Sequence, residues 1–216
     1  MDFFNHPYYA TMMNINRVIG AWPYQARWKN TAYRCITLIL AIVQLAGQMI
    51  CLVVYIRDDE SIILLIPAFL TAIFSIFKWM NNMLKMETFT KLLESIKENQ
   101  NMYTKKEEKH IFDEYAQEGR LIVRGYLVLT YCTIGSYVAE PLVSCFINII
   151  LYSNYTLPHV YPVPIHWYIV DMDKNFHPIW EFESICIVSI MTYSLATDSS
   201  FFILLQHARG LFVLVQ

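Results

Sequence analysis

Four long apolar runs alternate with polar segments along the chain, and they determine its predicted architecture. Each run holds about twenty or more residues, which at 1.5 Å per residue is enough for a helix to cross a hydrocarbon layer of roughly 30 Å. The pattern therefore predicts an all-α membrane protein with four transmembrane helices. Their expected ranges are 36–56, 62–82, 121–151 and 179–205.

The polar segment between the second and third runs, 83–120, also carries a helical pattern. Its apolar residues follow the i, i+3, i+4, i+7 spacing of one helix face and resume after a polar break. They are Phe89, Leu92, Leu93, Ile96, Ile111, Phe112 and Tyr115. We therefore expect a helical hairpin that extends spans two and three. This apolar face needs something to cover it, and we expect it to be left exposed in this chain. The residues concerned are Phe89, Leu93, Ile96 and Phe112.

Prolines predict where helices end or bend. Pro23 should end a short helix that begins near Asn14, because the residue before a proline disfavours the helical conformation. Span three, 121–151, is longer than a bilayer needs and contains the pair Glu140-Pro141. It is therefore expected to tilt, to kink or to extend beyond the membrane.

Basic residues are distributed unevenly, although the net charge is only −2. The stretch 83–124 holds eight of the 16 Lys and Arg residues. Short basic loops stay on the cytoplasmic side of a membrane, so this stretch and the basic N-terminus are predicted to be cytoplasmic. The predicted organisation is a cytoplasmic N-terminal segment (1–34) and a transmembrane region (35–216), the latter with a cytoplasmic hairpin (83–120) and an outer loop (152–178). The outer loop contains a glycosylation sequon at Asn154.

Composition excludes several classes of function. With 56% hydrophobic and 16% charged residues, the chain is unlike a soluble domain or a nucleic-acid-binding protein. All five cysteines fall in or beside apolar runs, as expected of small core residues. The histidines of the outer loop, His159, His166 and His177, match no familiar metal-ligand spacing. We expect no enzymatic activity, no catalytic residue, no metal and no cofactor.

Residues spread over the whole chain resemble those of insect odorant receptors. Before the first span stand Asn16, Arg17, Gly20, Trp22 and Pro23; the outer loop has Pro162, Val163, Pro164 and Asp171; the fourth span has Tyr193, Asp198, His207, Gly210, Leu211 and Phe212. The resemblance implies seven spans and a chain about twice as long, so the sequence corresponds to an N-terminal fragment with four of the seven helices.

The resemblance also implies a function and partners. Such a subunit would bind small apolar odorants and gate a cation channel with a co-receptor subunit, in the plasma membrane of olfactory sensory neurons. The pore would be lined by the seventh span, so this fragment alone is expected not to conduct. The cytoplasmic hairpin would pack subunits against one another.

The resemblance implies an odorant cavity among the outer halves of spans two, three and four, together with a later span. Depth arithmetic along the predicted helices selects six candidate ligand-binding residues: Phe69, Ile73, Ile134, Tyr137, Ile187 and Met191. In span four, Asp198 and His207 are expected to be structural polar residues. An intramembrane carboxylate is costly unless it has partners, and for Asp198 we expect Thr197, Ser199, Ser200 or interfacial water to supply them.

Three alternatives remain at this point. A gustatory receptor fragment would share the topology and differ downstream of Gln216. A four-span scaffold of the tetraspanin type would need a cysteine-rich second outer loop, and 153–177 contains no cysteine. A G-protein-coupled receptor fragment would have the opposite orientation, with its basic loop after an odd-numbered span.

Overall fold

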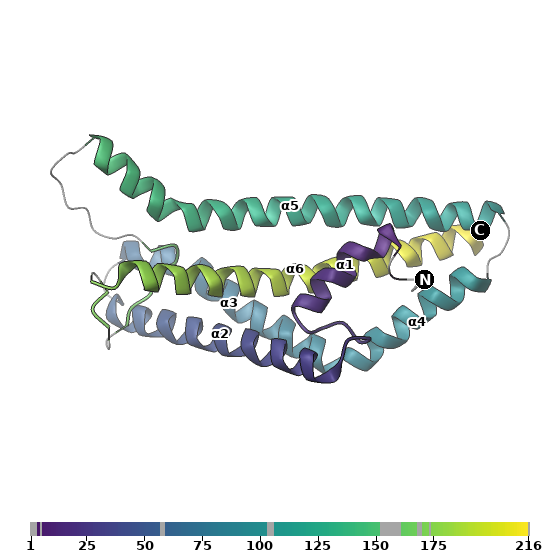
Figure 1. Ribbon diagram of the computed structural model, residues 1–216, viewed down its shortest axis with the longest axis horizontal. Helices are drawn as coiled ribbons and strands as arrows, with labels where there is room; N and C mark the ends of the chain where they lie inside the picture. The colour runs from purple at the N-terminus through teal and green to yellow at the C-terminus, as the bar shows by residue number, and fades with distance from the viewer. Residues whose placement is uncertain are drawn as a thin grey trace. The chain divides into compact units, whose positions relative to one another are not determined.

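The computed structural model describes residues 4, 6–56, 59–102, 106–151, 161–167, 170–172 and 174–215. Within these residues the chain is all-helical, without strands (Figure 1). The helices are α1 (Pro7–Val18), α2 (Arg27–Val54), α3 (Asp59–Leu84), α4 (Met86–Met102), α5 (Lys106–Leu151) and α6 (Phe176–Val215). In this described part, four helices are long and apolar enough to cross a membrane, within Arg27–Val54, Ile62–Leu84, Lys109–Ser144 and Phe176–Leu214. The predicted fold class is confirmed.

The helical hairpin after the second span forms as predicted, with one interruption. Helix α3 ends at Leu84 and α4 begins at Met86, so only Lys85 separates them. The amide of Lys85 still donates to the Asn81 carbonyl at 3.0 Å, and the Lys85 carbonyl still accepts from Phe89 at 2.9 Å. These are helical i to i−4 bonds, so the hydrogen-bonding ladder is kept through the bend.

Helix α5 joins the second arm of the hairpin to the third span without a break over 46 residues. Pro141 lies inside it, and the helix changes direction towards its C-terminal end (Figure 1). A proline removes one backbone hydrogen bond and its ring clashes with the preceding turn, so the kink expected at Glu140-Pro141 is present.

The chain divides into two compact units, which are described separately. Unit 1 comprises Met1–Ile36, Lys78–Leu129 and Thr192–Gln216, and unit 2 comprises Thr37–Phe77 and Thr130–Met191. Unit 1 thus contains α1, α4 and one end of each long helix. Unit 2 contains the other end of each long helix and the described part of the segment between α5 and α6.

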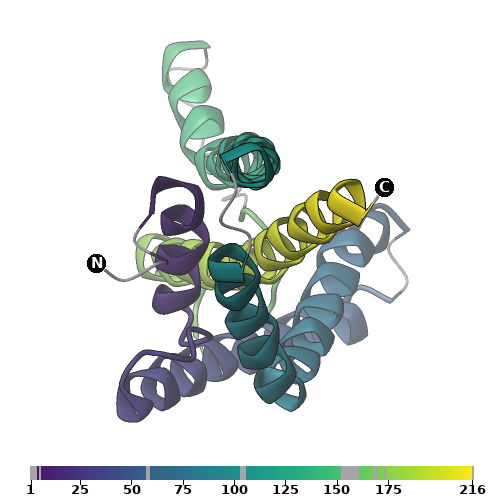
Figure 2. The same cartoon turned by 90° about the vertical axis from the view of Figure 1, so that its right-hand side faces the viewer.

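In unit 1, α1 covers the apolar face of the hairpin. The buried cluster there combines side chains of the N-terminal segment with side chains of α4, α5 and α6: Phe4, Tyr9, Met12, Met13, Trp22, Leu93, Ile96, Val123 and Ile203. Helix α1 lies across α6, and α4 lies beside the C-terminal part of α6 (Figures 1 and 2).

The prediction that the hairpin face is exposed was therefore wrong. Leu93 is 0% exposed, Ile96 1% and Phe112 3%, and Phe89 packs against the same cluster. The cover comes from this chain's own N-terminal segment and from α6.

The N-terminal segment is fixed by polar side chains as well as by apolar packing. Asn16 is 1% exposed and donates to Oγ of Ser200 on α6 at 2.9 Å. Helix α1 ends at Val18, earlier than Pro23 would dictate, and Gly20 follows with φ of 71°. A glycine adopts this left-handed conformation without a steric penalty, so Gly20 is the residue that terminates the helix.

Unit 2 has its own buried core. Ile134 of α5, Ile187 of α6 and Val163 of the connecting segment form it, with Ala68, Val138 and Met191 packed against them. The connecting segment runs back over the helices: the amide of His166 donates to the Gly47 carbonyl of α2 at 3.5 Å. Indole Nε1 of Trp180 donates to the Val138 carbonyl of α5 at 3.2 Å.

Candidate functional site

A cavity of about 540 Å³ lies within unit 2. Side chains from α2, α3, α5, α6 and the segment 161–165 line it. Its volume falls inside the range of roughly 300 to 1,000 Å³ that is typical of small-molecule sites. The cavity is therefore large enough to be a binding site.

Most of the wall is apolar, and its shape follows from helix periodicity. On α3 the lining residues are Ile63, Leu64, Pro67, Ala68, Thr71 and Ala72, which repeat every turn along one face. The two alanines leave space that larger side chains would fill. On α6 the wall is formed by Ile187, Ile190 and Met191, at i, i+3 and i+4.

The segment 161–165 closes one side of the cavity with Tyr161, two prolines and two aliphatic residues. Val163 is 9% exposed and Ile165 5%. The hydroxyl of Tyr161 donates to the Met172 carbonyl at 2.9 Å, which ties this segment to the stretch before α6. The segment therefore behaves as a packed wall of the site.

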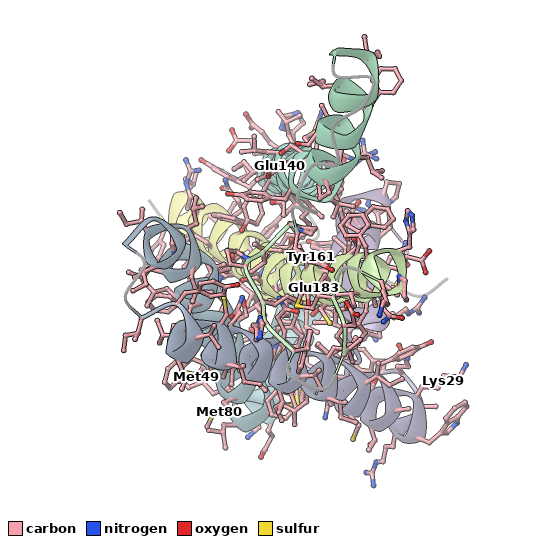
Figure 3. All side chains as sticks on the ribbon, turned by 90° about the vertical axis from the view of Figure 1, so that its left-hand side faces the viewer. Lys29, Met49, Met80, Glu140, Tyr161 and Glu183 are labelled. Carbon is pink, nitrogen blue, oxygen red and sulfur yellow. The ribbon has the colours of Figure 1, made fainter. Side chains whose placement is uncertain are left out.

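The polar part of the wall is small. Gln44 and Gln48 contribute from α2, and Glu140 contributes from α5. The Nε2 atom of Gln44 donates to Oε2 of Glu183 on α6 at 2.8 Å. Figure 3 labels Glu140, Tyr161 and Glu183 on their elements. An apolar cavity with few polar groups suits a small, mainly apolar molecule.

The structure brings three of the six candidate ligand-binding residues to this cavity: Tyr137, Ile187 and Met191. Ile134 lies next to it, in the core with Val163 and Ile187. Phe69 and Ile73 are half-buried on α3, while the lining residues are their neighbours Ala68 and Ala72. Neighbouring residues point about 100° apart around a helix. Phe69 and Ile73 therefore lie at the depth of the cavity but on a different face of α3 from the lining residues. Ligand contact by the six residues stays a prediction.

The segment 162–165 and the two glutamines were not selected from the sequence. Gln44 and Gln48 did carry a signal, because they are polar, one turn apart and inside an apolar span. Asn154 lies outside the described residues, so its glycosylation stays a prediction.

Asp198, in unit 1, has different partners from those expected. Nζ of Lys78 on α3 lies 2.9 and 2.8 Å from its two carboxylate oxygens, and the hydroxyl of Tyr126 on α5 donates to Oδ2 at 2.9 Å. The expected partners instead donate to carbonyls of their own helix, Thr197 to Tyr193, Ser199 to Leu195 and Ser200 to Ala196. Such i−4 bonds are common for Ser and Thr in helices, so the expectation was wrong for these three side chains. The alternative of interfacial water stays a prediction.

His207 lies in unit 1 against the hairpin. Its ring stacks on Phe112, with centroids 5.3 Å apart and planes at 18°, and its Nε2 lies 3.3 Å from Nδ2 of Asn99. It thus contacts both arms of the hairpin, and its structural role stays a prediction.

Comparison with protein families gives a match over most of the chain. A family model described as 7tm Odorant receptor matches residues 60–216. Comparisons with curated proteins and with solved structures give no match.

Proposed function

Because the chain belongs to the odorant receptor family, we propose that the unit 2 cavity binds a small, mainly apolar volatile molecule and that this binding gates a cation channel assembled with a co-receptor subunit. The observation that carries the proposal is the cavity of about 540 Å³ with its largely apolar wall. The family match favours an odorant receptor over a gustatory receptor, a four-span scaffold or a G-protein-coupled receptor.

The cavity suits such a ligand in size and in chemistry. Ile187, Ile190 and Met191 offer aliphatic contact, and Tyr137 adds an aromatic ring. Burying apolar surface contributes about 25 cal/mol per Å², which is the main source of affinity for a molecule with few polar groups. We include Phe69, Ile73 and Ile134 as residues whose substitution would reshape the wall, since they lie on or beside its elements.

We further propose that the N-terminus and the hairpin face the cytoplasm. The basic stretch 83–124 supports this orientation through the positive-inside rule. Plasma-membrane location in olfactory sensory neurons, glycosylation at Asn154 and pairing with a co-receptor are parts of the same proposal and rest on family membership.

Filling the cavity tests the proposal. Ala72 lines it and is 3% exposed, so Ala72→Trp should occupy the space that a ligand needs. The full chain in lipid nanodiscs would be titrated with a panel of volatile probes, and binding should fall at least about tenfold. Phe74→Trp is the matched control, because Phe74 is on the same helix but 64% exposed. Equal binding by both variants and the unsubstituted chain would overturn the proposal.

A further inference from the structure

An open pocket of about 380 Å³ lies in unit 1, beside the turn that joins α1 to α2. Its lining residues are Arg17 and Val18 from the last turn of α1, Gln25 from the turn, and Lys29 and Tyr33 from the first two turns of α2. Lys29 lies at the N-terminal end of α2 (Figure 3). Two of the five lining side chains are thus cationic, and none is acidic.

The protein itself does not neutralise these two cations. Among the described residues, neither Arg17 nor Lys29 forms an ion pair. Nζ of Lys29 instead lies 5.5 Å from the ring centroid of Trp28. Over residues 3–56 the sequence has four basic residues and no acidic one. An anion that enters the pocket is therefore attracted by both cations and does not have to displace an internal carboxylate.

The turn between α1 and α2 is held against α2 by side-chain hydrogen bonds. Nδ2 of Asn30, a residue 7% exposed, donates to the Trp22 carbonyl at 2.8 Å. Nε of Arg34 donates to the Gly20 carbonyl at 2.7 Å. These bonds fix the last turn of α1 against the first turn of α2, so binding does not have to order the backbone that carries the two cations.

The pocket adjoins the outer surface of a helix that can span a membrane, Arg27–Val54. Tyr33 and Ile36 follow Lys29 at i+4 and i+7, which places the three residues on one face of α2. Tyr33 is 43% exposed and Ile36 55%. Trp28, next to Lys29, is 70% exposed, as is typical of aromatic residues at the depth of lipid headgroups. A molecule in the pocket therefore has apolar side chains to follow towards the hydrocarbon layer.

We propose that this pocket binds the headgroup of an anionic membrane phospholipid, with a terminal phosphate on Arg17 and Lys29 and the acyl chains along Tyr33 and Ile36. A guanidinium group matches two phosphate oxygens at once, and an ammonium group supplies a compact positive charge. A phosphomonoester carries about −1.5 to −2 charges at pH 7, which suits two unpaired cations. The pocket shares no lining residue with the unit 2 cavity, so the proposal does not depend on the function of that cavity.

Lipids that differ only in the headgroup test the proposal. Phosphatidic acid and phosphatidylcholine with identical acyl chains would be titrated into the detergent-solubilised full chain, and native mass spectrometry would give the dissociation constant of the first bound lipid. Phosphatidic acid should bind at least about tenfold more tightly, because each cation near a lipid phosphate contributes about fivefold. The preference should weaken as the ionic strength rises. Equal affinities would overturn the proposal.

Glycerol 3-phosphate distinguishes a lipid from a soluble phosphate compound, because it carries the same phosphate group without acyl chains. It should bind at least about tenfold more weakly than phosphatidic acid, since it buries no apolar surface on α2. If it binds as tightly, the pocket takes soluble phosphate compounds, and the assignment to a lipid is overturned.

Variants assign the preference to the pocket. Arg17→Gln and Lys29→Gln should each lower the ratio of the two lipid affinities about fivefold, and the double variant should lower it to about one. Arg27→Gln is the matched control, because Arg27 is exposed on the same turn of α2 as Lys29 but does not line the pocket. Its ratio should be nearly unchanged. A loss equal to that of Lys29→Gln would overturn the proposal and would indicate attraction by diffuse surface charge.

These variants should fold normally, because Arg17, Arg27 and Lys29 are all exposed. The free energy of unfolding in SDS, measured for each variant, should equal that of the unsubstituted chain. The exchange variant Arg17→Lys/Lys29→Arg keeps both charges, so it should still prefer phosphatidic acid. A ratio of about one for this variant would overturn the proposed role of the two charges.

Discussion

Replacing Lys78 with methionine should break a charged network that links α3, α5 and α6 within unit 1. Nζ of Lys78 lies 2.9 and 2.8 Å from the two oxygens of Asp198 and 2.9 Å from Oγ of Ser194. The hydroxyl of Tyr126 donates to the same carboxylate at 2.9 Å. Removal of Lys78 would leave Asp198 with one neutral donor and no counter-charge.

The magnitude follows from how far the pair is shielded. Removing one partner of a fully buried ion pair costs about 3 to 5 kcal/mol, whereas exposed pairs contribute about 0 to 1 kcal/mol. The side chains of Lys78 and Asp198 are 37% and 28% exposed in the chain, which lies between these cases. We therefore expect Lys78→Met to lower the free energy of unfolding by about 2 kcal/mol. Asp198→Asn keeps an acceptor for Tyr126 and should cost about 1 kcal/mol.

Titration of the detergent-solubilised chain with SDS would give the free energy of unfolding for each single variant and for the double variant. A double-mutant cycle should return a coupling of about 1 to 2 kcal/mol between Lys78 and Asp198. Lys91→Met is the control, because its partner Glu87 lies one turn away and both side chains are more than two-thirds exposed, at 71% and 84%. No measurable change is expected there. Additive effects of Lys78→Met and Asp198→Asn would refute the reasoning.

Two further substitutions test the packing of unit 1 by the same titration. Leu93→Ala should lower the free energy of unfolding by about 2 to 5 kcal/mol, because Leu93 is 0% exposed. Leu92→Ala is the control and should cost much less, because Leu92 is 44% exposed. Similar losses of stability in the two variants would contradict a covered hairpin face. Gly20→Ala should cost more than about 1 kcal/mol, because φ is +71° and the added Cβ would lie 2.5 Å from the Asn30 carbonyl oxygen; unchanged stability would rule out this strain.

Long regular segments could be predicted from the sequence because their signal is local. The apolar runs predict α2, α3, α5 and α6, and the unbroken pattern from Phe112 into Leu121 predicts that α5 is continuous. The cover over the hairpin could not be predicted in the same way. It depends on α1, a helix of 12 residues whose packing partners are distant in the sequence, such as Leu93 and Ile203.

For the candidate site, the sequence predicts how deep a residue lies along its helix but not the direction in which its side chain points. Counting residues along a helix gives depth at 1.5 Å per residue, and Tyr137, Ile187 and Met191, which were selected in this way, line the cavity. Their contact with a ligand stays a prediction. Direction around the helix requires knowledge of the neighbours. On α3 the apolar residues occur on all sides, so nothing in the sequence distinguishes Ala72 from Ile73.

Polar residues inside apolar spans carry information of a third kind. Each one predicts that a partner exists, because an unpaired polar group in an apolar surrounding is costly. Lys78 and Asp198 in unit 1, and Gln44 and Glu183 in unit 2, are such residues, and each pair joins two different helices. The sequence thus indicates that a partner is needed, and the packing of the helices determines which residue it is. Lys78 and Asp198 bond each other directly, whereas the Gln44–Glu183 pair leaves the Oε1 atom of each residue buried and without a partner among the described residues. The first pair therefore satisfies its need for partners more fully than the second.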